Sequence, residues 1–266
     1  MDGRRLSKIA VMALSGGMDS TGLLSHLLAD DYTVHALSYD YGQKHKLELE
    51  RAKANIDYLA DNNIHISHKI VDLQSAMSIF HSALTTEGYD VPEGHYEEDQ
   101  MKQTVVPNRN AIFSSVLYGY ALSIATREDT DVKIALGVHS GDHAIYPDCR
   151  PEFYEALEHA FQVGNWESDK VSFYLPYLDG DKETILRDAE ASLDKLGLDF
   201  DTIFANTNTS YNPDEKGRSS GKSGADVERI LAFHAIGRAD PVTYVKSWPE
   251  VLEDAINTEK KHKEKI

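Results

Sequence analysis

The sequence predicts an α/β fold: a doubly wound, mostly parallel sheet with helices on both faces, followed by a small helical appendage. Short, wholly apolar segments alternate with segments whose apolar residues recur at helical spacing, which is the pattern of such a sheet. The 266 residues suffice for one large domain of roughly 150 residues or more and an appendage. We expect residues 1–200 to form the sheet domain and residues 201–266 to form the appendage.

The first part of the chain alternates between the two kinds of segment. Residues 9–14 (IAVMAL) are wholly apolar, as in a strand buried on both faces of a parallel sheet. Leucines at helical spacing predict a helix over 21–30, and a second strand is expected over 34–38. A helix is expected over 45–62 because its apolar residues share one face. Residues 64–71 are then a plausible third strand.

The remaining elements follow a long gap. Residues 82–103 contain Gly, Pro and acidic residues without apolar periodicity, so we expect a surface loop there. Helical spacing returns over 108–127, and residues 132–138 (VKIALGV) predict another buried strand. In the appendage we expect a helix over 226–236. A final helix should begin at 247–250 (SWPE), which has the spacing of a capping box with Pro in the first turn.

Composition excludes several classes of protein. The net charge of −17 repels a phosphate backbone, so direct binding to nucleic acid is not expected. The single cysteine, Cys149, excludes a disulfide framework and any zinc site with two thiolates from this chain, and it favours a reducing compartment. No stretch approaches the roughly 18 apolar residues of a membrane helix. We therefore expect a soluble, cytoplasmic protein without a membrane partner.

The string SGGMDST, residues 15–21, is placed between the first strand and the first helix. Its two glycines allow a tight turn that brings backbone N–H groups close to an anion. The helix N-terminus adds about half a positive charge, and the hydroxyls of Ser15, Ser20 and Thr21 can donate hydrogen bonds. The segment predicts a phosphate site, although a glycine-rich turn by itself is often only structural.

A rival phosphate motif lies at Gly221-Lys222-Ser223, which matches the end of a Walker loop. That motif requires a glycine five positions earlier, where this chain has Lys216. No apolar strand precedes it. We therefore do not expect a Walker-type site.

Three further strings follow strand ends or begin helices: DYGQKH at 40–45, VPNRN at 106–110 and GVHSGDHAIYPDCRPEF at 137–153. An open α/β sheet gathers its ligand at such positions. Together with residues 15–21 they resemble the 7-cyano-7-deazaguanine synthases of the queuosine and archaeosine pathways. These enzymes belong to the PP-loop ATP pyrophosphatase superfamily. The resemblance runs from about Ile9 to Tyr244.

The resemblance implies an ATP-dependent ligase. ATP adenylates 7-carboxy-7-deazaguanine, ammonia displaces AMP to give an amide, and a second ATP-dependent activation dehydrates the amide to the nitrile. It implies ATP and Mg²⁺ as cofactors, two small-molecule substrates and a possible homodimer. Alternatives are a variant that stops at the amide or joins the activated deazaguanine to another amine, and a non-catalytic protein that binds ATP or a deazapurine. A PP-loop enzyme acting directly on tRNA is disfavoured by the net charge and by the lack of paired cysteines.

The resemblance also implies which residues contact ATP. They are Leu14, Ser15, Gly16, Gly17, Met18, Asp19, Ser20, Thr21, Gly22, Leu23, Leu24 and Gly137. Asp19, Arg109 and Lys182 are the expected catalytic residues. Cations must offset the repulsion between a carboxylate and a triphosphate, and Arg109, Arg150 and Lys182 are the candidates for this role, together with Mg²⁺. Plainer interpretations are that Asp19 orients the loop, that Arg109 pairs with an acidic neighbour, and that Lys182 begins a solvated helix.

The expected substrate residues are Tyr41, Gln43, Asn110, Asp142, Tyr146, Asp148 and Arg150. A carboxylate such as Asp142 or Asp148 matches the donor face of a deazaguanine, and Tyr146 can stack on its ring. His139 and His143 have the spacing of helical metal ligands, but they flank Gly141 in a loop, so a metal role is not expected.

The chain departs from the family where zinc is normally held by four cysteines. The flanking residues match, but the ligand positions carry Ser210, Ser220, Ser223 and Asp226. Serine hydroxyls keep their protons near neutral pH, so we expect no zinc here. Ser223 and Asp226 instead have the spacing of a capping box, and packing of the following helix must supply the remaining stability.

Overall fold

The computed structural model describes residues 8–43, 47–82, 105–144, 146–210, 214 and 217–264, without the side chains of Asp142 and Ala144. The surface loop expected at 82–103 lies outside these residues, except for Ser82.

The strands form one parallel sheet in the order β3-β2-β1-β4-β5. They are β1 (Lys8–Ala13), β2 (Tyr32–Asp40), β3 (Ser67–Asp72), β4 (Val132–Ala135) and β5 (Val171–Tyr174). Every neighbouring pair is parallel. The predicted α/β class is confirmed, and β5 is an additional strand that the apolar pattern did not predict.

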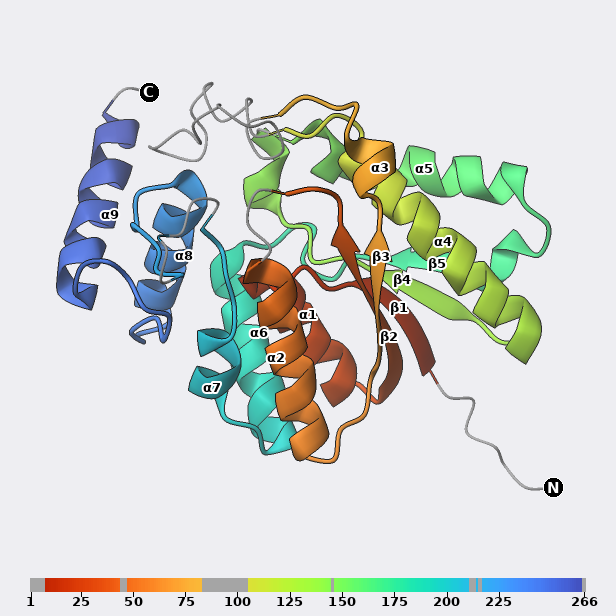
Figure 1. Cartoon of the computed structure of the whole chain (residues 1–266), viewed down its shortest axis with the longest axis horizontal. Coiled ribbons are helices and arrows are strands. Elements are labelled where there is room, and N and C mark those ends of the chain that lie inside the picture. The colour runs from red at the N-terminus through yellow and green to blue at the C-terminus, as the bar shows by residue number, and fades with distance from the viewer. Residues whose placement is uncertain are drawn as a thin grey trace.

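Helices cover both faces of the sheet (Figure 1). The helices α1, α2, α6 and α7 lie on one face, α3, α4 and α5 lie on the other, and α8 and α9 stand beside the first group. Their bounds are Met18–Ala29 (α1), Leu47–Asp61 (α2), Gln74–Met77 (α3), Arg109–Glu128 (α4), Pro151–Gly164 (α5), Lys182–Leu196 (α6), Phe200–Ala205 (α7), Gly224–Ala235 (α8) and Trp248–Lys263 (α9).

The central strand β1 is buried on both faces, as its wholly apolar sequence predicted. Ala10 and Met12 face the core beneath α1 and α6. Ile9 and Val11 point to the opposite face and pack in the core beneath α4. Because side chains alternate along a strand, one apolar segment supplies both layers.

The order of the strands places a crevice between β1 and β4. The chain builds β2 and β3 on one side of β1 and then crosses to β4 on the other side. The covering helices change side at the same point: α1 and α2 lie on one face of the sheet, and α4 and α5 lie on the other. At such a switch point the loops at the carboxyl ends of the strands separate and leave room for a ligand.

The appendage has a small core of its own formed by α8 and α9. Val227, Ile230, Tyr244, Val251 and Ala255 are buried together there. Ser223 is the N-cap of α8 and accepts a hydrogen bond from the Asp226 N–H at 3.2 Å. The predicted capping box at Ser247 and Glu250 begins α9, with a proline in its first turn.

The appendage is also continuous with the main core. Phe200 and Phe204 of α7 stack at 4.4 Å, and Phe233 of α8 packs edge-on against Phe204 at 6.0 Å. All three belong to the cluster that lies beneath α1 and α6. A division of the chain at residue 200 therefore stays a prediction.

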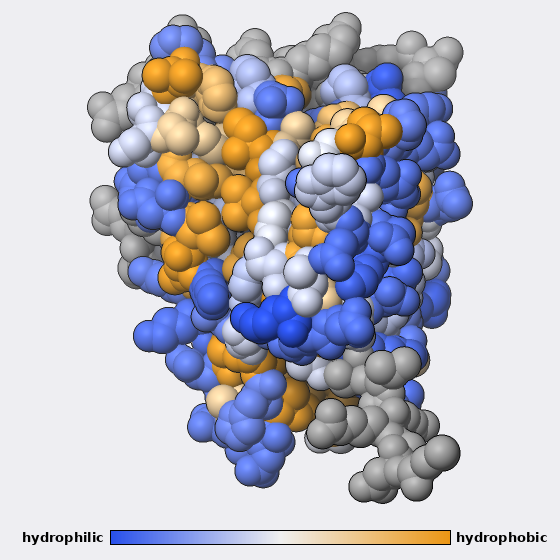
Figure 2. Space-filling model, turned by 90° about the vertical axis from the view of Figure 1, so that its right-hand side faces the viewer, coloured by the Kyte–Doolittle hydropathy of each residue, from blue (hydrophilic) through white to orange (hydrophobic). Residues whose placement is uncertain are grey.

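Figure 2 shows the side of the molecule that lies toward the right in Figure 1, on which apolar patches alternate with hydrophilic residues. Val163 in α5 and Trp166 just after it are among the exposed large apolar residues. Exposed apolar side chains are common on protein surfaces. None of the helices within the described ranges combines the length and apolar character that crossing a membrane requires.

Two helical glycines offer a matched test of the packing between α1 and α6. A Cβ at Gly22 would lie 2.5 Å from Ile185 Cγ2, whereas a Cβ at Gly119 in α4 would have no atom within 4 Å. We expect G22A to lower the free energy of unfolding in urea by about 1 to 3 kcal/mol through overpacking. G119A should raise it by about 0.5 to 1 kcal/mol, because alanine favours a helix. Equal effects of the two substitutions would contradict the close packing.

Candidate active site

The loop between β1 and α1 turns tightly at Gly16, as its sequence predicted. Gly16 has φ +84°, and a Cβ there would lie 2.0 Å from the backbone oxygen of Glu48 in α2. The Ser15 hydroxyl accepts a hydrogen bond from the Gly17 N–H at 3.1 Å. The Ser15 and Ser20 hydroxyls lie 3.0 Å apart. A left-handed glycine and these hydroxyl contacts therefore set the course of the loop into the N-terminus of α1.

A buried lysine joins this loop to distant parts of the chain. The Lys182 ammonium, at the start of α6, lies 2.9 Å from Asp19 Oδ2 and 2.9 Å from His139 Nε2. Glu228 Oε2, from α8, lies 3.4 Å from the same nitrogen. Lys182 is only 5% exposed, so it is not part of a solvated helix start. The structure brings the predicted residues Asp19 and Lys182 into direct contact.

Asp19 is held in its ionised form. Burial alone would raise the pKa of its carboxyl, but the neighbouring Lys182 and His139 outweigh burial and lower it. Asp19 Oδ1 is buried and has no hydrogen-bond partner. An ionised carboxylate whose second oxygen has no partner among the described residues would suit Mg²⁺ as a ligand.

A cavity of about 250 Å³ opens at the carboxyl ends of β1, β2 and β4. It lies at the switch point of the sheet, next to the phosphate loop. The predicted residues that line it are Ser15, Asp19, Ser20, Tyr41, Gln43, Arg109, Asn110, Gly137 and Tyr146. The structure thus collects residues from all four sequence strings around one space.

Aromatic residues form much of the wall. Tyr39 and Phe113 stack with their centroids 4.0 Å apart, and the Tyr39 hydroxyl donates to the Phe113 carbonyl at 3.0 Å. Tyr146, from the segment after β4, also lines the cavity and is buried. These rings suit a flat heterocyclic ligand.

Polar residues at the wall are held by their own contacts. Gln43 accepts a hydrogen bond from the Tyr41 N–H at 2.9 Å and donates to the Tyr39 carbonyl at 3.1 Å. Asn110 donates to Cys149 Sγ at 3.3 Å and to the Asp148 carbonyl at 3.4 Å. Gln43 therefore closes the turn after β2, and Asn110 fixes the segment that carries Cys149.

Several predicted residues lie away from the cavity. The side chains of Leu14, Met18, Leu23 and Leu24 are buried in the core beneath α1. Gly22 faces Ile185, and Thr21 is buried within α1. Residues in such places would meet a nucleotide only through their backbone.

The polar residues of the segment after β4 differ in their surroundings. Arg150 is exposed and donates from Nε to the His143 carbonyl at 2.8 Å. Neither Arg150 nor Asp148 lines the cavity. The side chain of Asp142 lies outside the described residues. His139 contacts Lys182, and within the described ranges no cluster of three or more His, Cys, Asp or Glu residues could hold a metal.

Sequence reasoning missed several lining residues. They are Tyr39, Glu48, Phe113, Ser114 and Tyr154. Glu48 is chemically the most informative: burial raises the pKa of its carboxyl to about 7, although Arg109 opposes the rise. Its place in the first turn of α2, just after the string at 40–45, was the available signal.

Comparisons with known proteins show the family of this chain. The family model "Queuosine biosynthesis protein QueC" matches residues 9–237. The chain belongs to the QueC family. The 7-cyano-7-deazaguanine synthase of Marinomonas sp. is 43% identical over 239 residues, covering 90% of this chain and 99% of that protein. The synthase of Methanoregula boonei is 43% identical over 235 residues, covering 88% of this chain and 98% of that protein.

In this QueC-family chain, the donor set at the four positions where the resemblance implies zinc does not fit a thiolate site. The Ser220 hydroxyl accepts from the Lys222 N–H at 3.3 Å, and the Ser223 hydroxyl caps α8. Burial raises the pKa of Asp226, although hydrogen bonds from Ser219 and Ser223 oppose the rise. Protonated hydroxyls and a carboxyl that resists ionisation are weak ligands for Zn²⁺. The absence of zinc stays a prediction.

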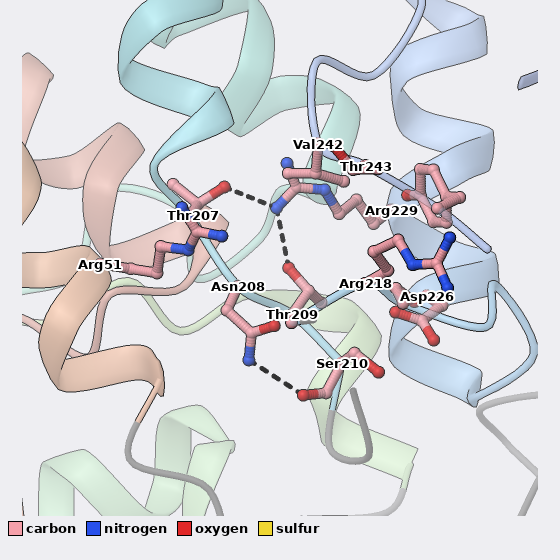
Figure 3. Close-up of a pocket in the computed structure, with 13 residues that line it drawn as sticks. Arg51, Thr207, Asn208, Thr209, Ser210, Arg218, Asp226, Arg229, Val242 and Thr243 are labelled. Carbon is pink, nitrogen blue, oxygen red and sulfur yellow. Dashed lines mark hydrogen bonds between the residues drawn. The ribbon is translucent and has the colours of Figure 1, made fainter. Parts of the chain in front are cut away.

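A buried ion pair between Arg229 and Asp240 holds this region together in the QueC-family chain, and Figure 3 shows the bonds of Arg229 to Thr207 and Thr209. Arg229 of α8 donates to Asp240 from Nε at 2.6 Å and from Nη2 at 2.9 Å. Its Nη1 donates to the hydroxyls of Thr207 at 2.7 Å and Thr209 at 3.0 Å. Burial opposes the charged guanidinium, but Asp240 outweighs this and raises the pKa of Arg229. These bonds tie α8 to the segment that follows α7.

We expect D240N to lower the free energy of unfolding by about 3 to 5 kcal/mol, because it leaves the buried Arg229 charge without its counter-ion. The matched control is D254N in α9, whose partner Lys246 is half-exposed. D254N should cost less than about 1 kcal/mol. Urea unfolding of both variants measures the difference, and equal losses would contradict the role given to the buried pair.

The raised pKa of Asp226 gives a test with a defined sign. A carboxyl whose pKa is raised by folding contributes stability below its unfolded pKa, and that contribution is lost as the pH rises through the folded pKa. We therefore expect D226N, which stays neutral, to unfold at a higher temperature than the wild type at pH 8. The gain should shrink toward pH 4. The control S223A should lose about 1 kcal/mol of N-cap stability, and a D226N variant that is less stable at pH 8 would contradict the account.

Proposed function

We propose that this chain is an ATP-dependent C–N ligase that converts 7-carboxy-7-deazaguanine and ammonia to 7-cyano-7-deazaguanine. The observation that carries the proposal is a cavity where Ser15 and Ser20 of the loop after β1, Asp19 with its partner Lys182, and Arg109 meet an aromatic wall. The relatives named 7-cyano-7-deazaguanine synthase support it.

In the first step, the loop at residues 15–17 and the N-terminus of α1 bind the phosphates of ATP. Their backbone N–H groups and the helix dipole favour the anion. Asp19, which Lys182 holds in place, would be a ligand for Mg²⁺, and the ion would supply neutralisation of the phosphate charge.

The substrate ring lies against the aromatic wall, with its carboxylate toward Arg109. The guanidinium offsets the repulsion between the carboxylate and the triphosphate. A carboxylate oxygen attacks the α-phosphorus, pyrophosphate leaves, and an acyl-adenylate forms. Ammonia then attacks the acyl carbon, and AMP leaves with the former carboxylate oxygen to give the amide.

The second round uses the same site. The amide oxygen attacks the α-phosphorus of a second ATP, and pyrophosphate leaves again. Loss of AMP then removes that oxygen while nitrogen loses its protons, which leaves the nitrile. We further propose a cytoplasmic location, on the composition, and a homodimer, on the family resemblance.

The test is incubation with ATP, Mg²⁺, ammonium and 7-carboxy-7-deazaguanine, followed by mass spectrometry. We expect the nitrile and two AMP per product. An amide or a conjugate as the final product would replace the nitrile in the proposal, and binding of ATP without AMP formation would overturn it.

Asp19 should be needed for adenylation. We expect D19N to lower substrate-dependent exchange of pyrophosphate into ATP by about 100-fold or more, because the loop loses its fixed charge beside the phosphates. The control is D31N, at an exposed residue with φ +62°, a conformation that asparagine tolerates. D31N should keep the wild-type rate, and unchanged exchange in D19N would contradict the assignment.

A further inference from the structure

The candidate cavity has two carboxylates among its described lining residues, Asp19 and Glu48. They come from the first turns of two neighbouring helices, α1 and α2. The two helix starts are joined by the close approach of the Glu48 backbone oxygen to Gly16. The backbone of Glu48 is therefore placed next to the loop after β1, and its carboxylate reaches the cavity from there.

The surroundings of the two carboxylates differ. Asp19 contacts an ammonium at 2.9 Å, and its pKa is lowered, as described above. Glu48 faces Arg109 from α4 and Tyr41 from the segment after β2, and burial raises its pKa to about 7. Two carboxylates whose pKa values are shifted in opposite directions by their surroundings suit different chemical roles. Asp19 stays charged, whereas Glu48 can accept a proton near neutral pH.

The proposed reaction needs such an acceptor. Near neutral pH ammonia is mostly ammonium, which must lose a proton before its lone pair can attack the acyl carbon. The nitrogen must lose a second proton when AMP leaves and the amide forms. In the dehydration, nitrogen loses its last two protons as the C–N triple bond forms and the second AMP leaves. Attack of the carboxylate on ATP, by contrast, releases no proton.

We propose that Glu48 is the general base that removes protons from the substrate nitrogen. The inference rests on the proposed function and assigns this residue to the steps at nitrogen only. Its carboxylate oxygen accepts the proton, and water takes that proton from the site between turnovers. Arg109 and Glu48 line the same cavity and interact electrostatically. Because the proposed function places the substrate carboxylate at Arg109, it also places the acyl carbon on the side of the cavity where Glu48 lies.

The inference is tested by comparing E48Q with the control E50Q, an exposed neighbour on the same helix. We expect E48Q to keep pyrophosphate exchange within about threefold of the wild type, while amide formation falls by about 10²- to 10⁴-fold. At saturating ammonium, the wild-type rate of amide formation should rise with pH and level off above about 7. E48Q should lack this inflection, and E50Q should keep it.

Activity with hydroxylamine in place of ammonium shows whether Glu48 removes protons or has only a structural role. It is largely unprotonated at neutral pH, so E48Q should lose less activity with hydroxylamine than with ammonium. E48D, which keeps a carboxylate, should recover part of the rate and the pH inflection. Loss of exchange in both variants, or full amide formation in E48Q, would overturn the assignment of Glu48. A wild-type protein with neither exchange nor product would instead overturn the proposed function.

Discussion

The Lys182 ammonium is the point on which the candidate site depends. It is buried, and a buried ammonium requires close partners to offset its loss of solvation. Those partners come from α1, from the segment after β4 and from α8. One cation therefore aligns the phosphate loop, the switch-point crevice and the appendage. Through Glu228, the appendage therefore contacts the same lysine that binds Asp19 in the candidate site.

The sequence predicted most of the fold because its signals are local. A short, wholly apolar segment identified β1, helical periodicity identified α4, and a capping pattern identified the start of α9. The four-residue strand β5 is too short to produce a clear pattern. The motifs also located the site, but they could not show that Glu48, Phe113 and Tyr154 share one cavity, because that proximity depends on how separate elements pack. Gln43 is predicted to bind substrate. It lines the cavity, and both ends of its amide also form hydrogen bonds with backbone atoms.

In the appendage, too, the sequence predicted local features but not the contacts between residues that are distant in the chain. The replaced cysteine positions were visible in the sequence, and so was the N-cap at Ser223. The ion pair that ties the region together joins Arg229 to Asp240 and to hydroxyls near residue 208, and no local pattern relates these positions. Geometric complementarity between a planar guanidinium and a carboxylate is a property of the folded molecule.

The contact between Gly16 and the Glu48 backbone has a consequence for a two-round reaction. In the proposed reaction, one site activates two different groups in turn, first a carboxylate and then an amide. The residues of the site must therefore hold the same positions in both rounds. The loop after β1 and the start of α2 meet through the backbone atoms of Gly16 and Glu48, and such close packing limits independent movement of the two elements. In the proposed reaction, this contact would keep the start of α2 at the same distance from the loop in both rounds.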